Sequence, residues 1–447
     1  MLSSTGLVVN VTGLDVCTVN VTLTHDGLSD KVAFQIWLPL KGWNGRFQGT
    51  GGSGFSAGTP GLAGLAATAK AGFAVGMTDG GDIGQDPFTP RKNLIIGPGQ
   101  LDLPRLLPNA PKYSYWTGCS TGGRQGYTLA QKYPTDFDGI LAMAPALRYP
   151  TLFLQIAMAE FYANYLQHRP ELCVLQAFQQ AAVEACDALD GVTDSIISRP
   201  NQCNFDPYSL VGKTVDCAGK PVTVIKEDAD LVMGVHNGVR SASGELLYEG
   251  YPWGTSTAGL AVIGPLLGGN WIKYFIAKDL DFDLTEINTL EKAIDFAYRS
   301  VYQWSSLLMN DNPQLSNFRD AGGKLLTWHG TADSLIPLNN TISYRGIVEQ
   351  SMGSSDSINE FYRIFLVPGL DHCMGGSNLF PVGALEALMD WVEKSQAPDT
   401  LRATKSGAPT SSVERKLCLW PLEAYYNGKG DKNKASSYDC RKLTSTK

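Results

Sequence analysis

Apolar and polar residues alternate along the first part of the chain, as they do in half-buried β-strands. Residues 7–23 alternate in this way, and residues 31–40 (KVAFQIWLPL) continue the β pattern. A glycine-rich loop follows at residues 49–54 (GTGGSG). The chain therefore opens with strands that end in a flexible turn-forming segment.

Strands and helices then take turns. The pattern predicts a helix at 61–71, a strand at 72–77, a strand at 113–117, a helix at 123–132 that ends before Pro134, and a strand at 138–144. Such alternation predicts an α/β fold with a mostly parallel sheet and helices on both faces.

The pattern changes after Pro150. Helical stretches, clustered cysteines and aromatic residues follow, and sheet-like signals return only at 324–328 (KLLTW) and 361–367 (FYRIFLV), before a final helix at 384–394. We therefore predict an α/β core in two parts, residues 1–147 and 322–447, split by a large inserted lid domain at residues 148–321.

Composition narrows the class of protein. Hydrophobic residues make up 43% and charged residues 18% of the 447, which is typical of a globular chain. The net charge of −7 without a long Lys/Arg run argues against nucleic acid, and the lack of about 18 unbroken apolar residues argues against a membrane span.

Cysteine usage indicates an oxidising compartment. Nine cysteines are many for a reduced cytosolic protein, and N-x-T sequons at Asn10, Asn20 and Asn339 point the same way. Residues 1–6 do not look like a signal peptide, and the cysteine count is odd. We therefore expect a secreted protein whose signal has been removed or whose N-terminus is truncated.

Ser120 lies in a G-x-S-x-G pattern, Gly118-Cys119-Ser120-Thr121-Gly122. A strand precedes this pattern and a helix follows it, which is the context of a nucleophile elbow. A serine hydroxyl becomes a nucleophile only when a base takes its proton and a third group orients that base. The alternative is a glycine-rich structural turn with a surface serine.

The base must be one of five histidines. His372 lies on the loop after the 361–367 strand, where open α/β sheets build their sites. We interpret His25, His168 and His236 as solvated or structural, and His329 as a hydrogen-bonded histidine under the acid loop.

Asp333, just after the 324–328 strand, is the best-placed orienting acid. Asp371 competes, but it adjoins His372 and is poorly placed to reach its Nδ1–H. The order Ser120, Asp333, His372 is that of α/β-hydrolases. The Thr121 N–H and that of Gly51 or Gly52 are expected to form the oxyanion hole, unless the glycine-rich loop is a plain turn.

Several segments together resemble the tannase/feruloyl esterase family. They are WNGRF at 43–47, GTGGSG, GCSTGGRQG at 118–126, WHGTAD at 328–333 and PGLDHC at 368–373 followed by Gly375-Gly376, together with the cysteine-containing tail. The resemblance implies an α/β-hydrolase core, a lid domain and hydrolysis of phenolic acid esters. It also implies a disulfide between Cys119 and Cys373 and a tail closed by Cys418 and Cys440.

Residues 186–196 (CDALDGVTDSI) hold three carboxylates around a glycine. Hard oxygen ligands at this density suit Ca²⁺, although an acidic turn is often only solvated. The resemblance implies a structural calcium ion in the lid, with the Asp187, Asp190 and Asp194 carboxylates as ligands. The carbonyls of Val192 and Ile196 would complete the site. Cys186 and Cys203 bracket this loop and are expected to close it with a disulfide.

Two departures from the family pattern stand out. Cys17 resembles a cysteine whose family partner lies upstream, where this chain has nothing, so we expect an unpaired thiol. Cys173 and Cys217 have no assigned partners, although they could pair with each other. Between Asp79 and Lys112 a Gly-His motif is missing, and a core helix is expected to be shortened or lost.

The sequence thus predicts a serine carboxylic ester hydrolase that cleaves small-molecule or polysaccharide-linked phenolic esters through an acyl-enzyme. One alternative is a tannase acting on galloyl esters. A second is a catalytically impaired or truncated family member. The sequence does not identify the acyl group of the substrate. Lid aromatics that could line a pocket, such as Trp253, Trp271, Tyr274 and Phe275, are best explained as lid core.

Overall fold

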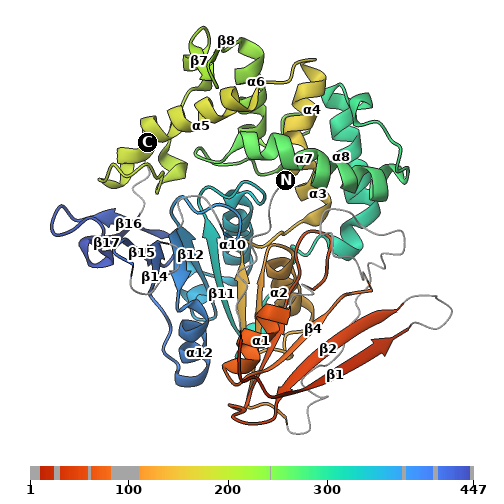
Figure 1. Ribbon diagram of the computed structural model, residues 1–447, viewed down its shortest axis with the longest axis vertical. Coiled ribbons are helices and arrows are strands. Elements are labelled where there is room, and N and C mark those ends of the chain that lie inside the picture. The colour runs from red at the N-terminus through yellow and green to blue at the C-terminus, as the bar shows by residue number, and fades with distance from the viewer. Residues whose placement is uncertain are drawn as a thin grey trace.

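The computed structural model describes residues 11–24, 31–58, 62–81, 110–241, 243–374, 379–405 and 411–442. Eight strands form a central sheet in the order β1-β2-β4-β3-β5-β6-β11-β12 (Figure 1). Their bounds are β1 Val16–Leu23, β2 Val32–Pro39, β3 Arg46–Thr50, β4 Ala74–Thr78, β5 Tyr113–Cys119, β6 Gly139–Met143, β11 Lys324–Gly330 and β12 Tyr362–Val367. The β1–β2 and β2–β4 pairs are antiparallel, and every other pair in this sheet is parallel. The mostly parallel sheet is confirmed.

Helices cover both faces of this sheet. Neighbouring residues of β5 point to opposite faces, so Tyr115 packs with Leu388 and Trp391 while Trp116 packs with Tyr127. The helices that pack on the sheet are α1 Leu62–Lys70, α2 Thr121–Lys132, α10 Leu338–Met352 and α12 Ala384–Lys394, with the short α9 Ser316–Asp320 and α11 Ser355–Asn359 nearby.

The lid stands above the carboxyl ends of the parallel strands (Figure 1). Its helices are α3 Tyr149–Ile156, α4 Met158–Tyr165, α5 Leu172–Cys186, α6 Lys226–Asn237, α7 Thr257–Trp271 and α8 Leu290–Leu308. They bury a large apolar cluster of their own, separate from the three clusters on the sheet. Trp271 and Phe275 lie inside that cluster and Trp253 and Tyr274 pack against it, so the interpretation of these aromatics as lid core is confirmed.

One lid segment, Thr257–Ala277, is long and apolar enough to cross a membrane by length and composition alone. More than half of it is buried inside the protein, where α7 packs against α3, α4 and α5. A core helix passes the same test of length and composition, so this segment is weak grounds for a membrane span.

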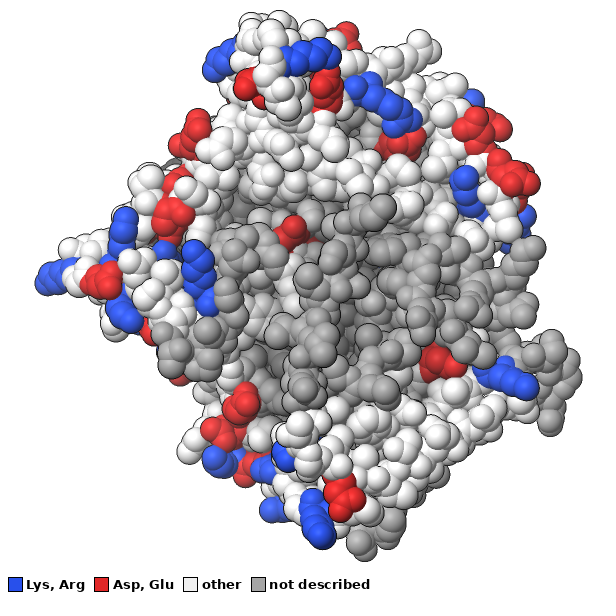
Figure 2. Space-filling view, in the orientation of Figure 1, with Lys and Arg blue, Asp and Glu red and all other residues white. Residues whose placement is uncertain are grey.

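Short strands complete the fold. The lid carries two hairpins, β7 Thr214–Cys217 with β8 Lys220–Thr223 and β9 Val239–Arg240 with β10 Leu246–Tyr248. After α10, the chain adds β13 Leu379–Val382, β14 Thr400–Lys405, β15 Glu414–Cys418, β16 Leu422–Tyr426 and β17 Tyr438–Lys442. On the face shown in Figure 2, positive and negative side chains are interspersed.

Four disulfides form: Cys119–Cys373, Cys173–Cys217, Cys186–Cys203 and Cys418–Cys440. The pairing that the sequence left open, Cys173 with Cys217, is among them. Cys17 is a free, exposed thiol, as expected. Four disulfides fit an extracellular protein. The expected loss of a core helix between Asp79 and Lys112 concerns residues 82–109, which lie outside the described residues, as does His25.

Candidate active site

Ser120 sits at the sharp turn between β5 and α2. Its backbone has φ 63° and ψ −120°, a conformation that residues other than glycine rarely adopt. The Ser120 N–H donates to Met143 O at 3.0 Å, and its carbonyl accepts from Ala146 and Arg124, which hold the strained turn in place. A Cβ on Gly118 would come within 2.6 Å of the Gly122 backbone, so the elbow requires glycine there. The turn has the geometry of a nucleophile elbow.

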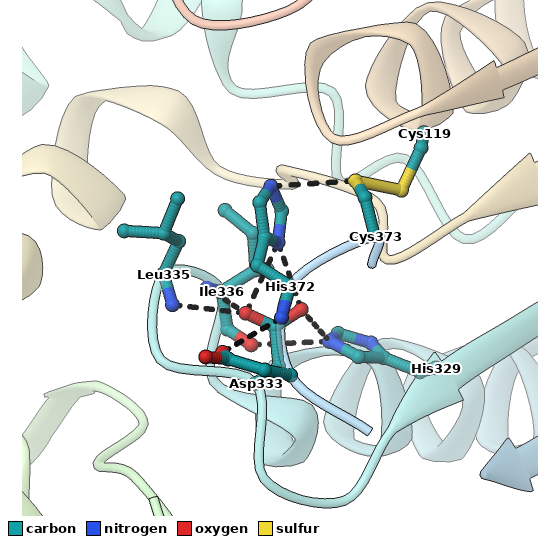
Figure 3. Close-up of a disulfide and its surroundings, with 8 residues drawn as sticks. Cys119, His329, Asp333, Leu335, Ile336, His372 and Cys373 are labelled. Carbon is teal, nitrogen blue, oxygen red and sulfur yellow. Dashed lines mark hydrogen bonds and ion pairs between the residues drawn. A yellow bond between two sulfur atoms is a disulfide. The ribbon is translucent and has the colours of Figure 1, made fainter. Parts of the chain in front are cut away.

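Asp333 and His372 meet at the ends of β11 and β12 (Figure 3). His372 Nδ1 lies 2.9 Å from Asp333 Oδ2 and 3.1 Å from Oδ1, so Nδ1 carries the proton. The Leu335 and Ile336 N–H groups also donate to Asp333 Oδ1, at 2.9 and 2.8 Å. Asp333 is completely buried, and these donors fix its carboxylate plane. The arrangement leaves His372 Nε2 as the lone-pair nitrogen of the neutral ring.

Asp371 does not compete for the ring. Its Oδ1 accepts from the backbone N–H of His372 at 2.7 Å and from both the N–H and hydroxyl of Ser334. It therefore ties the His372 loop to the Asp333 loop, and no bond from Asp371 to the His372 ring is present among the described residues.

His329 lies directly beneath Asp333. Its Nε2 is 3.1 Å from Asp333 Oδ2 and 3.0 Å from Ile336 O, while Nδ1 is 2.9 Å from the Thr341 hydroxyl (Figure 3). Both Nε2 partners are acceptors, so this nitrogen is a donor. His329 is the predicted hydrogen-bonded histidine under the acid loop. In the lid, His168 bonds to Asp228, and His236 stacks on Trp253.

The Cys119–Cys373 disulfide joins the two loops that carry Ser120 and His372. The bond spans 254 residues of sequence, and Cys373 Sγ lies 3.5 Å from His372 Nε2 (Figure 3). Nε2 therefore faces the disulfide, on the side where the elbow begins. The described residues show no hydrogen bond between Ser120 Oγ and His372, a contact that often forms only with substrate.

Burial and the neighbouring charges shift the pKa values of Asp333 and His372 in opposite directions. Burial by itself raises the pKa of Asp333, but the neighbouring His372 and His329 outweigh it and hold that pKa well below its usual range. Burial by itself lowers the pKa of His372, but the Asp333 carboxylate, and then Asp371, raise it above its ordinary value. The site thus holds Asp333 as an anion and stabilises a proton on His372.

The glycine-rich loop packs against the elbow, but the N–H groups of Gly51 and Gly52 already donate hydrogen bonds within the protein. The Gly51 N–H donates to Thr117 O at 3.1 Å, and the Gly52 N–H donates to Gln125 Oε1 at 3.0 Å. A Cβ on Gly52 would lie 2.0 Å from Ser56 O, so close packing explains the glycine. Because both N–H groups already have acceptors, these bonds argue against Gly51 or Gly52 as the second oxyanion donor. That assignment remains a prediction. Thr121 is the first residue of α2, where backbone N–H groups lack helical partners.

Gln125 is a positioning residue that the sequence patterns do not reveal. Its amide accepts from Gly52 and donates to Ala57 O at 2.8 Å, and so pins the glycine-rich loop to α2. The only local signal is its place five residues after the elbow serine, in GRQG. Its partners lie more than 65 residues away, so sequence alone does not reveal them.

The acidic loop, residues 187–196, lies in the lid between the two halves of the Cys186–Cys203 disulfide. Asp187 and Asp190 are buried, and the Asp187 carboxylate accepts the N–H groups of Asp194, Ser195 and Ile196. One oxygen of Asp194 pairs with Arg415, and the other, Oδ1, is buried with no partner. A buried carboxylate oxygen without a donor suits a hard cation.

The three loop carboxylates do not converge fully. Among the described residues, only Glu171, Cys173 and Cys217 bring three ligand atoms within 4.8 Å of one another, and those two cysteines are bonded to each other. Burial, and further the neighbouring Asp194, raise the pKa of Asp190. The donor chemistry still suits Ca²⁺, because the loop offers hard carboxylate oxygens and one of them, Asp194 Oδ1, is buried without a partner.

The chain is similar to several known proteins over most of its length. The family model described as tannase and feruloyl esterase matches residues 104–271 and 258–441. A probable feruloyl esterase from Arthroderma benhamiae is 38% identical over 96% of this chain and 86% of that protein. An esterase structure from Aspergillus oryzae has a TM-score of 0.82 at 27% identity, covering 96% of this chain and 90% of the other. A tannin acyl hydrolase from Aspergillus niger has a TM-score of 0.81 at 26% identity, covering 96% and 87%.

These matches extend over the elbow, over the loops that carry Asp333 and His372, and over the lid. The chain therefore belongs to the tannase and feruloyl esterase family of carboxylic ester hydrolases.

Proposed function

We propose that this protein hydrolyses esters of plant phenolic acids, as a feruloyl esterase does, through an acyl-enzyme on Ser120. The observation that carries the proposal is the covalent link between the two loops: Cys119 adjoins Ser120, Cys373 adjoins His372, and His372 Nδ1 is held by buried Asp333. A serine beside a histidine oriented in this way suits acyl transfer.

The chemistry follows from the positions of these groups. His372 Nε2 takes the proton of Ser120 Oγ as the oxygen attacks the ester carbonyl, and the protonated ring then gives that proton to the departing alcohol. Asp333 stabilises the imidazolium that forms in between. The Thr121 N–H, which lies at the start of α2 and has no partner within the helix, would stabilise the oxyanion. A water molecule, activated by His372, then releases the phenolic acid.

A galloyl ester is the second candidate substrate, favoured by the likeness to a tannin acyl hydrolase over nearly the whole chain. Feruloyl and galloyl groups differ in ring substituents and in the vinyl spacer. The deciding experiment is turnover of methyl ferulate, caffeate, p-coumarate and gallate, with labelling by a fluorophosphonate probe. Labelling of Ser120 with turnover of a cinnamate ester is expected. A folded, unlabelled protein would instead support an impaired family member.

We expect the disulfide between Cys119 and Cys373 to control the rate as well as stability. Replacing both cysteines with alanine should lower kcat, because the elbow and the His372 loop lose their tether, and should destabilise the fold by about 2–5 kcal/mol. The matched control removes Cys418 and Cys440, whose disulfide joins β15 to β17 in the tail. An unchanged kcat in the first variant would show that the tether is dispensable.

We also propose that the acidic loop binds a structural calcium ion, with Asp187, Asp190 and Asp194 as carboxylate ligands and Val192 and Ile196 as carbonyl ligands. The buried, unpartnered Asp194 Oδ1 supports this proposal. When bound, the ion would supply positive charge to a buried acidic cluster.

Chelation with EDTA is therefore expected to lower the melting temperature. A site held at a free Ca²⁺ concentration 100 times its Kd stabilises the fold by about 2.7 kcal/mol. Differential scanning calorimetry with and without added Ca²⁺ measures the effect. The Asp190→Asn variant should lose the response, and an identical melt of the wild type in excess EDTA would contradict the proposal.

Secretion remains part of the proposal, supported by the four disulfides. Of the predicted glycosylation sequons, Asn20 has an exposed side chain on the edge strand β1, whereas Asn339 is partly buried at the start of α10. Asn10 lies outside the described residues. Asn20 is therefore the better candidate for a glycan. The proposed substrates include phenolic esters attached to a polysaccharide, since the proposed chemistry involves only the acyl carbonyl.

A further inference from the structure

Thr331 is a buried hydroxyl that the catalytic scheme does not use. It follows β11 and precedes Asp333 by two residues, and only 1% of its surface is exposed. Its hydroxyl makes two hydrogen bonds to segments far away in sequence. The Gly369 N–H donates to Thr331 Oγ1 at 2.8 Å, and Oγ1 donates to Ile197 O at 3.2 Å. Because Gly369 supplies the proton of the first bond, the single hydroxyl proton is free for the second.

The first bond joins the two loops of the acid–base pair. Gly369 lies three residues before His372, and Thr331 two residues before Asp333. Two backbone hydrogen bonds join the same two loops: Thr331 N–H donates to Val367 O at 2.9 Å, and Ala332 N–H donates to Leu370 O at 3.1 Å. The Thr331 hydroxyl connects these two loops to a third segment of the chain.

The second bond reaches the lid. Ile197 directly follows the acidic loop, whose backbone is organised by Asp187 and closed by the Cys186–Cys203 disulfide. Ile197 is itself buried in the lid cluster. A displacement of the acidic loop would therefore act on the Thr331 hydroxyl, and through it on the backbone that carries Asp333 and His372.

We propose that Thr331 is a positioning residue that couples the acidic loop of the lid to the Asp333 and His372 loops. The inference rests on the proposed function, because its consequence is the alignment of the acid–base pair for ester hydrolysis. It gives the acidic loop an influence on the rate, in addition to its place in the lid.

The test compares Thr331→Val, which keeps the shape and removes the hydroxyl, with Thr331→Ser, which keeps the hydroxyl. Thr331→Val is expected to lower kcat on methyl ferulate by about 10- to 100-fold with little change in KM, because small misplacements of aligned groups are costly. Thr331→Ser should stay close to wild type. The acid limb of kcat/KM should move to lower pH in Thr331→Val, because His372, faced by the carboxylates of Asp333 and Asp371, is then held less closely by Asp333.

Thr327→Val is the matched control. Thr327 is also buried, on β11, the strand that Thr331 follows, and its hydroxyl bonds to Tyr127 on the α2 side of the sheet, away from the Asp333 loop. It should lower the melting temperature without moving the pH profile. An unchanged kcat and pH profile in Thr331→Val, or equal loss in Thr331→Ser, would overturn the proposal.

If Thr331→Val does not fold, Thr331→Ala removes the same hydroxyl with less steric demand and carries the same comparison with Thr331→Ser. Failure of the proposed function has a different signature, because the wild type itself would then leave the phenolic esters uncleaved. Failure of the coupling shows as a fully active Thr331→Val variant of an active enzyme.

Discussion

Ser120→Ala is expected to lower kcat on methyl ferulate by about 10⁴- to 10⁶-fold, because the variant has no nucleophile for acyl transfer. The remaining rate would come from binding and from oxyanion stabilisation, which do not depend on the hydroxyl. Steady-state kinetics with enzyme purified free of host esterases measures the loss. Loss of fluorophosphonate labelling in the same sample reports the nucleophile directly.

The control for this variant is Ser306→Ala, which removes an exposed hydroxyl from the lid helix α8. It should leave both the rate and the labelling unchanged. Turnover by Ser120→Ala at more than a small fraction of the wild-type rate would place the nucleophile elsewhere in the chain.

Asp333→Asn is expected to lower kcat by about 10³- to 10⁴-fold while the protein still folds. The amide keeps the shape of the carboxylate, but it removes the charge that stabilises protonated His372 and can favour the wrong tautomer of the ring. Asp371→Asn provides the comparison, since Asp371 accepts from the backbone of His372 and from Ser334. A loss in Asp371→Asn as large as that in Asp333→Asn would reverse the assignment of the two acids.

The direction of the pH effect follows from the same pair. In the proposed mechanism His372 acts as the base only when it is neutral, and Asp333 holds the pKa of His372 above its ordinary value. The wild-type kcat/KM should therefore fall as the pH decreases through that raised pKa. Removing the charge in Asp333→Asn lowers the pKa of His372, so the acid limb of the residual activity should move to lower pH. A limb that stays in place would show that Asp333 does not set this pKa.

The sequence identified the parts of the site that local patterns mark. Ser120 stands between a strand and a helix, and Asp333 and His372 each follow a strand, so their types and places were enough to bring them together. The parallel core and its two-sided helices followed from periodicity in the same way. The resemblance supplied the Cys119–Cys373 pairing, which spacing alone does not fix.

Contacts between distant segments were beyond such reasoning. The direction of the Gly51 and Gly52 N–H groups depends on Thr117 and Gln125, which are remote in sequence. The sequence does not determine the partner of Cys173, because a hairpin of the lid brings Cys217 to it from 44 residues away. No local pattern marks Thr331, because its two partners come from the lid and from the loop after β12.

The Cys119–Cys373 bond also makes the intervening chain a covalent ring that contains the whole lid. A protease that cuts a surface loop of the lid would nick this ring without releasing either piece. On a denaturing gel the nicked enzyme would run as one species until a reducing agent separated the fragments. The bond between the elbow and the base loop therefore also protects the enzyme against losing its lid in surroundings rich in proteases.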